Sequence, residues 1–284
     1  MRCDIRGAFM NYRIVLDSSS NQRADGNRIA TVPLKIVTDN KEYTDHENLD
    51  VAAMLLELES YKGRSGTSCP NVADWLQAFG DAQYVFAIAI TSNLSGSYNA
   101  SVQAKQAYEE EYPGHRVCCL DTLSTGGEMV LIQEKLEQLI AQGLSFDEVE
   151  AAIREYMHHT HLSFMLERMD NLAKNGRVSP IVAKACGILN IRIVGCASDV
   201  GTLQPDHKCR GTKKALETIV KDMVEKGYHG GKVIIDHVYN PDAANTLREK
   251  ILEQFPEADI RIGLCGGLCC FYAEQGGLLV GYES

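Results

Sequence analysis

Short apolar runs alternate with amphipathic stretches along the first half of the chain. Four runs predict strands, at residues 12–16, 32–37, 84–90 and 116–120. Helices are predicted at residues 49–58, 72–79, from the end of the 91–97 loop to about 112, and 126–142. Another follows Ser145, which forms a capping box with Glu148. Residues 64–70 are predicted to be a polar loop. This alternation favours a mainly parallel sheet flanked by helices on both faces.

The second half of the chain follows a similar pattern. Strands are predicted at residues 162–166, 191–196, 232–237, 260–264 and 278–282, with a hairpin turn at 199–201. Helices are predicted at residues 169–175, 181–189, 213–226 and 242–255. At about 150 residues per domain, 284 residues predict two domains. The expected fold class is therefore α/β, with one α/β domain over residues 1–160, a second over 161–284, and residues 1–10 as a loose extension.

Charge and hydropathy exclude several classes of protein. Lys and Arg number 28 and Asp and Glu number 38, so the formal net charge is −10. This acidic balance argues against nucleic-acid binding and against docking on anionic lipid by bulk charge. No run approaches the roughly 18 apolar residues of a membrane span, and residues 1–10 lack the apolar core of a signal peptide. We expect a cytoplasmic protein with no stable membrane insertion.

Two hydroxyl-rich loops are the best candidates for ligand chemistry. The segment TSNLSGS, residues 91–97, joins a buried strand to a helix, where free N–H groups and the helix dipole attract an anion. Ser92, Ser95 and Ser97 add hydroxyl donors, and Gly96 lets a ligand approach the backbone. Residues 66–70, GTSCP, form a second such loop. Both loops can also serve simply as helix caps, but in an α/β domain they can converge at the carboxyl ends of the strands.

Other candidate residues leave different functions open. The chain lacks a nucleophile elbow, a phosphate loop and a dinucleotide-binding glycine motif. Asp17 and Asp121, at predicted strand ends, keep open an enzyme of acyl or phosphoryl transfer, although they can equally cap the following turns. Arg177 and Arg210 lie in predicted exposed turns, either as surface charges or as a docking site for a phosphate-bearing or acidic partner.

The chain contains ten cysteines, and none forms a C-x-x-C pair. Reduced, buried thiols that act as small hydrophobic groups are the simplest interpretation in a cytoplasmic protein. The cluster Cys265, Cys269 and Cys270 keeps open a thiol-based metal or redox sensor. No metal site is predicted.

Seven ordered segments together resemble the DegV family of bacterial fatty-acid-binding proteins. The resemblance runs from about Tyr12 to Glu283, through IVLDSSS, VPLKI, GTSCPN, LDTLSTGG, MDNLAKNGRVS and HKCRGTKKAL. The most specific match is TSNLSGSYNAS, which is similar to the family pattern S-x-L-S-G-T-Y-Q-S-A. Many members carry a His-Thr-Gly-Pro-Gly segment near the C-terminus. Here that region is CGGLCCFYAEQGG, and Tyr272 takes the position of the histidine.

The resemblance implies a long-chain fatty acid, such as palmitate or oleate, in a tunnel between the two domains. The carboxylate would be bound by hydroxyls and backbone N–H groups of Thr67, Ser68, Ser95, Gly96, Ser97 and Tyr272. Arg177 and Arg210 would face a separate kinase that makes acyl-phosphate. The leading hypothesis is thus a non-catalytic carrier without a cofactor. The alternatives are a small-molecule acyl- or phosphoryl-transfer enzyme and a DegV-like protein whose ligand has changed.

Overall fold

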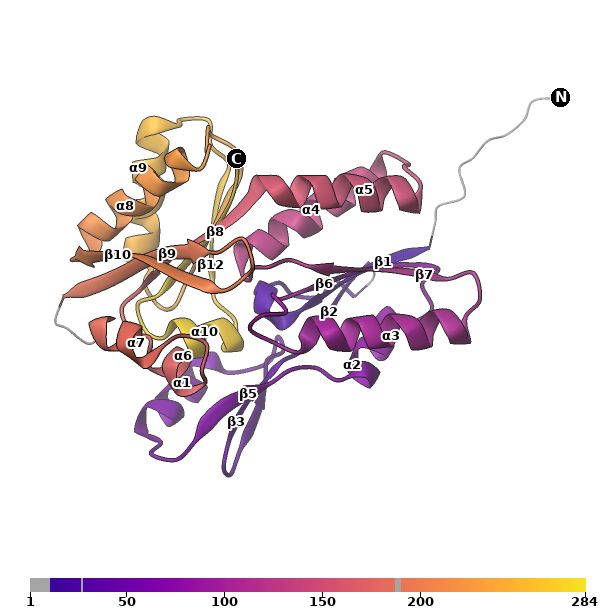
Figure 1. Cartoon of the computed structure of the whole chain (residues 1–284), viewed down its shortest axis with the longest axis horizontal. Helices are drawn as coiled ribbons and strands as arrows, with labels where there is room; N and C mark the ends of the chain where they lie inside the picture. Colours follow the sequence, from indigo (N-terminus) through magenta and orange to yellow (C-terminus); the bar gives the residue numbers. More distant parts are fainter. Residues whose placement is uncertain (1–10, 27, 187–189) are drawn as a thin grey trace.

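A computed structural model describes residues 11–26, 28–186 and 190–284. The expected loose extension at residues 1–10 lies outside the described residues. Two large sheets and one small sheet carry the fold, and helices cover both large sheets (Figure 1). The fold class is the predicted α/β class.

The first large sheet is parallel, as the sequence predicts. Its strand order is β2-β1-β6-β7, with β1 (Tyr12–Asp17), β2 (Ile29–Val32), β6 (Tyr84–Ala89) and β7 (Arg116–Asp121). Its helices are α2 (Val72–Phe79), α3 (Ser97–Glu111), α4 (Gly127–Ala141) and α5 (Phe146–Tyr156). Figure 1 shows α2 and α3 on one face and α4 and α5 on the other. The 91–97 segment follows the carboxyl end of β6 and leads into α3.

Alternate residues of β1 serve two separate cores. Ile14 and Leu16 are fully buried in the cluster that includes Phe146 and the apolar side of α4 and α5. Val15, between them, is buried in the cluster that includes Trp75 of α2 and the inner face of α3. Because successive side chains of a strand point to opposite faces, a continuous apolar run indicates a strand buried on both sides.

The predicted strand at residues 32–37 is wrong as a single element. β2 ends at Val32, and β3 (Lys35–Thr38) belongs to a small sheet of order β4-β3-β5, with β4 (Glu42–Thr44) and β5 (Ser65–Ser68). Pro33 lies at the break, where it cannot donate a backbone hydrogen bond to a sheet. The predicted polar loop at 64–70 is also corrected, because β5 pairs antiparallel with β3 and sets Thr67 opposite Ile36.

The second large sheet is mixed, and most of its pairs are antiparallel. Its order is β10-β9-β8-β13-β11-β12; β11 and β12 are parallel, and the other neighbours are antiparallel. The strands are β8 (Thr160–Leu166), β9 (Ile191–Ala197), β10 (Leu203–Arg210), β11 (Val233–His237), β12 (Ile260–Leu264) and β13 (Leu278–Glu283). The hairpin turn near 199–201 is present, but β10 after it was not predicted. The division near residue 160 stays a prediction.

Helices of the second half pack on and around this sheet. α8 (Thr212–Glu225) and α9 (Pro241–Gln254) share one apolar cluster with it. The shorter helices of the second half are α6 (Asp170–Lys174), α7 (Pro180–Cys186) and α10 (Gly267–Ala273). The first half adds α1 (Val51–Ser60) and the 3-10 turns η1 (Ser18–Ser20) and η2 (Met157–His159). Residues 187–189 of the predicted 181–189 helix lie outside the described residues. α10, which was not predicted, contacts α1, β3, α6 and η1.

Helix α4 packs against both large sheets. Met129 and Ile132 are buried against the first sheet, while Val130 and Leu131 are buried with Ile234 of β11. A helix with buried residues all round is a core helix rather than a surface helix. The two sheets thus share one central element.

The first turn of α4 carries a buried carboxyl group. Ser124 Oγ and Thr160 Oγ1 donate to the Glu128 carboxylate, the latter at 2.8 Å. Burial raises the pKa of Glu128 to about 7, and the two hydrogen bonds only partly offset that rise. The Glu128 carboxyl group thus links the start of α4 to the start of β8 by a hydrogen bond.

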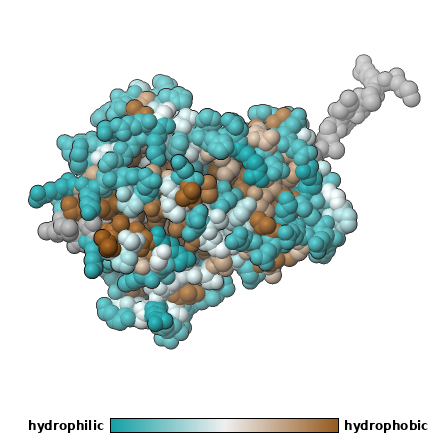
Figure 2. Space-filling view, in the orientation of Figure 1, coloured by the Kyte–Doolittle hydropathy of each residue, from teal (hydrophilic) through white to brown (hydrophobic). Residues whose placement is uncertain are grey.

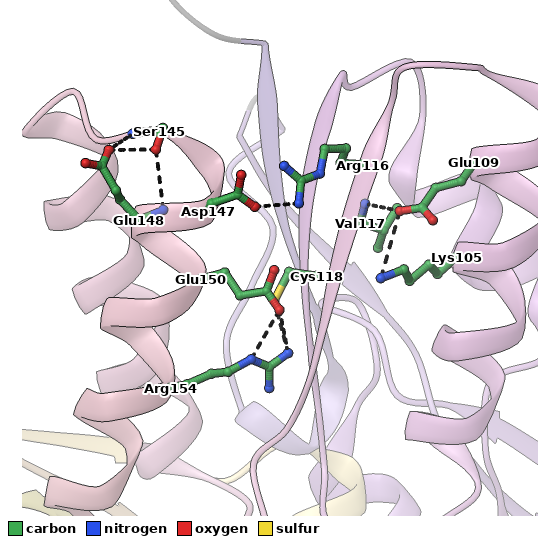
Figure 3. Close-up of polar contacts among 10 residues, drawn as sticks. All are labelled: Lys105, Glu109, Arg116, Val117, Cys118, Ser145, Asp147, Glu148, Glu150 and Arg154. Atoms are coloured by element: carbon green, nitrogen blue, oxygen red, sulfur yellow. Dashed lines mark hydrogen bonds and ion pairs between the residues drawn. The ribbon is translucent and has the colours of Figure 1, made fainter.

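One exposed ion pair links β7 to α5, and a second lies within α5 (Figure 3). Arg116 Nη2 lies 2.6 Å from Asp147 Oδ1, and Arg154 Nη2 lies 2.8 Å from Glu150 Oε1. Arg154 also reaches the Cys118 thiol at 3.7 Å. These pairs lie largely in solvent, so we expect them to add little to stability.

Candidate ligand-binding cavity

A cavity of about 310 Å³ lies between the two halves of the chain. Most of its wall is apolar, formed by Leu34, Ile90, Leu94, Phe164, Leu166, Leu172, Leu203, Leu268, Ala273 and Leu279. Residues from before and after position 160 both line it. The volume is within the usual range for small-molecule sites, and the wall fits an apolar ligand.

The outer wall beside α6 is also apolar. Leu172 of α6 lines the cavity, while Ile181 of the neighbouring α7 is 83% exposed. Figure 2 shows hydrophobic residues gathered on the visible face over the region that holds α6 and α7 in Figure 1. Apolar character therefore continues from the cavity to the surface here.

Hydroxyl groups from both halves meet on the wall of this cavity. Thr67 Oγ1 of β5 and Tyr272 Oη of α10 are 2.7 Å apart, and both residues line the cavity. Ser68, the next residue of β5, lines it as well and is exposed. The structure thus brings together three of the predicted site residues.

A distant aspartate positions the helix that carries Tyr272. The Asp45 carboxylate accepts the N–H groups of Gly267 at 2.7 Å and Leu268 at 2.9 Å, at the start of α10. A Cβ atom at Gly267 would lie 2.6 Å from Leu49 and 2.9 Å from the Asp45 carboxylate. Glycine is therefore required for this close approach.

The N-terminus of α3 forms another polar part of the wall. Ser95 and Gly96 line the cavity, and Gly96, the N-cap residue of this 15-residue helix, makes no side-chain cap hydrogen bond. A Cβ atom at Gly96 would lie 3.0 Å from the thiol of Cys69, so a glycine here leaves room for that side chain. Ser95 Oγ accepts the N–H of Ser97 at 3.2 Å. Free N–H groups and the helix dipole make this end suited to an anion.

Ser97 lies beneath the wall rather than on it. Its side chain is fully buried, and its hydroxyl donates to Asp17 Oδ2 at 2.7 Å. Asp17 is also fully buried, and burial raises the pKa of its carboxyl group while the hydrogen bonds to it oppose that rise. Asp121 Oδ1 accepts the N–H groups of Ser92 and Leu123. Both carboxylates therefore organise turns, which favours the structural interpretation of these residues over the enzyme hypothesis.

The two arginines that were predicted to share a role, Arg177 and Arg210, lie in different environments. Arg177 is half-buried and lines the cavity, and its Nε donates to the carbonyl of Leu94 at 3.2 Å. The expectation of a fully exposed turn is corrected for this residue. Arg210 ends β10, is exposed, and lies outside the set of residues that line the cavity.

The three clustered cysteines are buried, and two of their thiols donate to backbone carbonyls. Cys269 Sγ donates to the carbonyl of Ser19 at 3.3 Å, and Cys270 Sγ to that of Cys265 at 3.2 Å. Burial raises the pKa of the Cys269 thiol well above its ordinary value. Among residues 11–26, 28–186 and 190–284, no group of three or more His, Cys, Asp or Glu side chains could hold a metal ion. The described residues therefore give no support to a metal sensor.

Two polar residues of the wall were missed by the sequence analysis as cavity residues: Cys69 and Thr125. Cys69 directly follows β5, and Thr67, Ser68 and Cys69 all line the cavity, so strand alternation does not single out Cys69. Thr125 donates to the carbonyl of Ser19 at 3.0 Å. It belongs to the LDTLSTGG segment, whose role the pattern alone did not indicate.

A family model described as "Uncharacterised protein, DegV family" matches residues 11–284. The chain belongs to the DegV family. A DegV domain-containing protein of Streptococcus pneumoniae is 42% identical over 279 residues, covering 96% of this chain and 99% of the relative. Another, from Streptococcus gordonii, is 39% identical, with the same coverage.

Solved structures of DegV proteins share the fold over nearly the whole chain. A DegV family protein from Eubacterium eligens, loaded with heptadecanoic acid, is 42% identical with a TM-score of 0.94. The Streptococcus pneumoniae Fatty Acid Kinase (Fak) B3 protein, loaded with linoleic acid, is 41% identical with a TM-score of 0.92. Each comparison covers 96% of this chain and 99% of the other. Both of these solved structures thus contain a bound fatty acid.

Within the part of the chain that the structure describes, every helix is too short or too polar to cross a bilayer.

Proposed function

We propose that this protein binds a long-chain fatty acid in the cavity between its two halves and acts as a carrier. The observation that supports this most is a cavity with an apolar wall that also carries hydroxyl groups, free N–H groups and one guanidinium. The acyl chain would lie along the leucines and Phe164. The carboxylate would bind Thr67, Tyr272, Ser95 and the backbone of Gly96, with Arg177 nearby.

The apolar wall supplies the driving force for such a ligand. Each buried methylene contributes about 0.8 kcal/mol, so a palmitate tail gives on the order of 12 kcal/mol before the costs of association. The polar groups then fix the direction of the chain. A carboxylate without hydrogen-bond partners in this site would be strongly unfavourable, which is why several donors are needed at one end.

The carrier would present its fatty acid to a separate kinase. In that reaction a carboxylate oxygen attacks the γ-phosphorus of ATP, ADP leaves, and an acyl-phosphate forms. The name of the Fak B3 protein supports this second part of the proposal. Arg210 and the outer side of Arg177 would face the kinase. We also propose a cytoplasmic location, where the eight free cysteines of the described part of the chain would stay reduced.

Native mass spectrometry of the protein purified from cells, followed by organic extraction, tests the ligand. We expect a co-purified fatty acid of the palmitate or oleate class, reduced in Ser95→Ala. Ser101→Ala is the matched control, because its buried hydroxyl donates to the Tyr98 carbonyl one turn further along α3. A protein that contains no fatty acid when purified and does not bind added fatty acids would refute the proposal.

Transfer of labelled phosphate from ATP tests the kinase part. With a fatty-acid kinase from Streptococcus pneumoniae present, we expect acyl-phosphate to form on the loaded protein, and none to form on the protein alone. Labelled product without the kinase would instead favour the enzyme hypothesis.

A further inference from the structure

Asp17 receives hydrogen bonds from three separate segments of the chain. Its Oδ1 accepts the N–H of Ser19 at 3.2 Å as well as the Ser19 hydroxyl. Its Oδ2 accepts the N–H of Ile90 at 2.9 Å and the hydroxyl of Ser97 at 2.7 Å. The carboxylate therefore ties the turn after β1 to the end of β6 and to the first turn of α3.

The residues tied in this way surround the polar part of the cavity. Ile90 lines the cavity itself, and Ser97 directly follows Ser95 and Gly96, which also line it. Asp17 is fully buried and lies outside the set of cavity-lining residues. It is therefore placed to orient the groups that meet the ligand without touching the ligand.

We propose that Asp17 is the positioning residue of the carboxylate-binding turn: by holding Ile90 and Ser97, it aims the Ser95 hydroxyl and the free N–H groups of α3 at the fatty-acid carboxylate. This inference rests on the proposed function. It assigns to Asp17 a role different from the catalytic one considered from the sequence.

The chemistry of the site explains why a carboxylate is needed. Two backbone N–H groups, those of Ser19 and Ile90, bind different oxygens of Asp17. Backbone donors cannot reverse their polarity, so both oxygens must accept. A carboxamide of the same shape offers only one acceptor and would point its NH2 group at a buried N–H. Asp17→Asn therefore disturbs the turn with almost no change in volume.

Charge predicts the opposite result for this same substitution. A buried negative charge near the ligand carboxylate repels it, so a purely electrostatic role of Asp17 would make Asp17→Asn bind fatty acids more tightly. A positioning role makes the variant bind more weakly. The sign of the change thus separates the two explanations.

The experiment compares palmitic acid with hexadecan-1-ol, which has the same chain length but no charge. Dissociation constants are measured by displacement of a fluorescent fatty acid from wild type, Asp17→Asn, Ser97→Ala and the control Ser101→Ala. We expect Asp17→Asn to weaken palmitate binding about tenfold and alcohol binding less than about twofold. Ser97→Ala, which keeps both backbone hydrogen bonds to Asp17, should show a smaller loss in the same direction.

A second readout is the ¹³C chemical shift of the bound, carboxyl-labelled palmitate, which responds to the donors around the carboxylate. We expect it to move in Asp17→Asn and Ser97→Ala and to stay in place in Ser101→Ala. Equal losses for acid and alcohol, unchanged or tighter palmitate binding, or an unmoved carboxyl shift would overturn the positioning role. If Asp17→Asn does not fold, Ser97→Ala decides by the same criteria. Wild-type protein that binds no palmitate would instead refute the proposed function.

Discussion

The hydroxyl pair of Thr67 and Tyr272 allows a quantitative test of the polar end of the cavity. The two oxygens are 2.7 Å apart, and either can donate to the other. Each hydroxyl carries one proton, so one O–H is used within the pair and one remains for a ligand. This count is the same for both orientations of the pair.

Because of this count, the two substitutions should not be additive. In Thr67→Val or Tyr272→Phe, the remaining hydroxyl can still turn toward the carboxylate. We expect each single variant to lose less than about 1 kcal/mol of binding free energy, or under about fivefold in affinity. The double variant has no hydroxyl left there and should lose about 1.5–3 kcal/mol, or about 10- to 150-fold.

Displacement of a fluorescent fatty acid measures all four proteins of this double-mutant cycle, and urea unfolding checks that each is folded at the assay temperature. The coupling between the two sites is the quantity of interest. A single variant that loses as much as the double, or a double variant with wild-type affinity, would refute the reasoning. The first result would mean that the substituted hydroxyl alone binds the ligand, or that both hydroxyls are needed together, and the second that neither binds it.

Three further predictions concern the same chain. Because burial raises the pKa of Glu128 from 4.5 to about 7, the ionised group should destabilise the fold by about 3 kcal/mol above pH 7, a penalty that grows as pH rises from about 4.5 to 7 and is absent below. Glu128→Gln should therefore raise the free energy of unfolding in urea at pH 8 and leave it unchanged at pH 4.5; equal effects at both pH values would contradict this. Ser95→Ala should weaken fatty-acid binding by about 1–3 kcal/mol in the displacement assay, and wild-type affinity would remove Ser95 from the carboxylate site. Asp147→Ala, which breaks an exposed pair with Arg116, should leave the urea midpoint unchanged, and a clear shift would show that this pair is structural.

Local patterns predicted the parallel sheet well, and they failed where distant contacts decide the structure. The strands β1 and β6 are apolar on both faces, so their sequence alone indicates a buried parallel sheet. β5 has the sequence SGTS and no apolar residue. It is a strand because it pairs with β3. The hydrophobic pattern within the segment does not indicate this pairing.

The same reasoning explains why α10 was missed. Its first N–H groups bind Asp45, which is more than 200 residues earlier in the chain, so the local sequence has no capping residue to recognise. The contact between Thr67 and Tyr272 spans 205 positions. Their common place in the site came from the family resemblance, while Ser95 and Gly96 were found from the local strand–loop–helix pattern.

The position of α4 between the two large sheets has a thermodynamic consequence. Met129 and Ile132 belong to one core, and Val130 and Leu131 to another. If α4 unfolds, both sheets expose the apolar surface that it covers, so its unfolding destabilises both sheets. The free energies of the two halves are therefore coupled, and the chain should melt in one cooperative transition whose calorimetric and van't Hoff enthalpies agree.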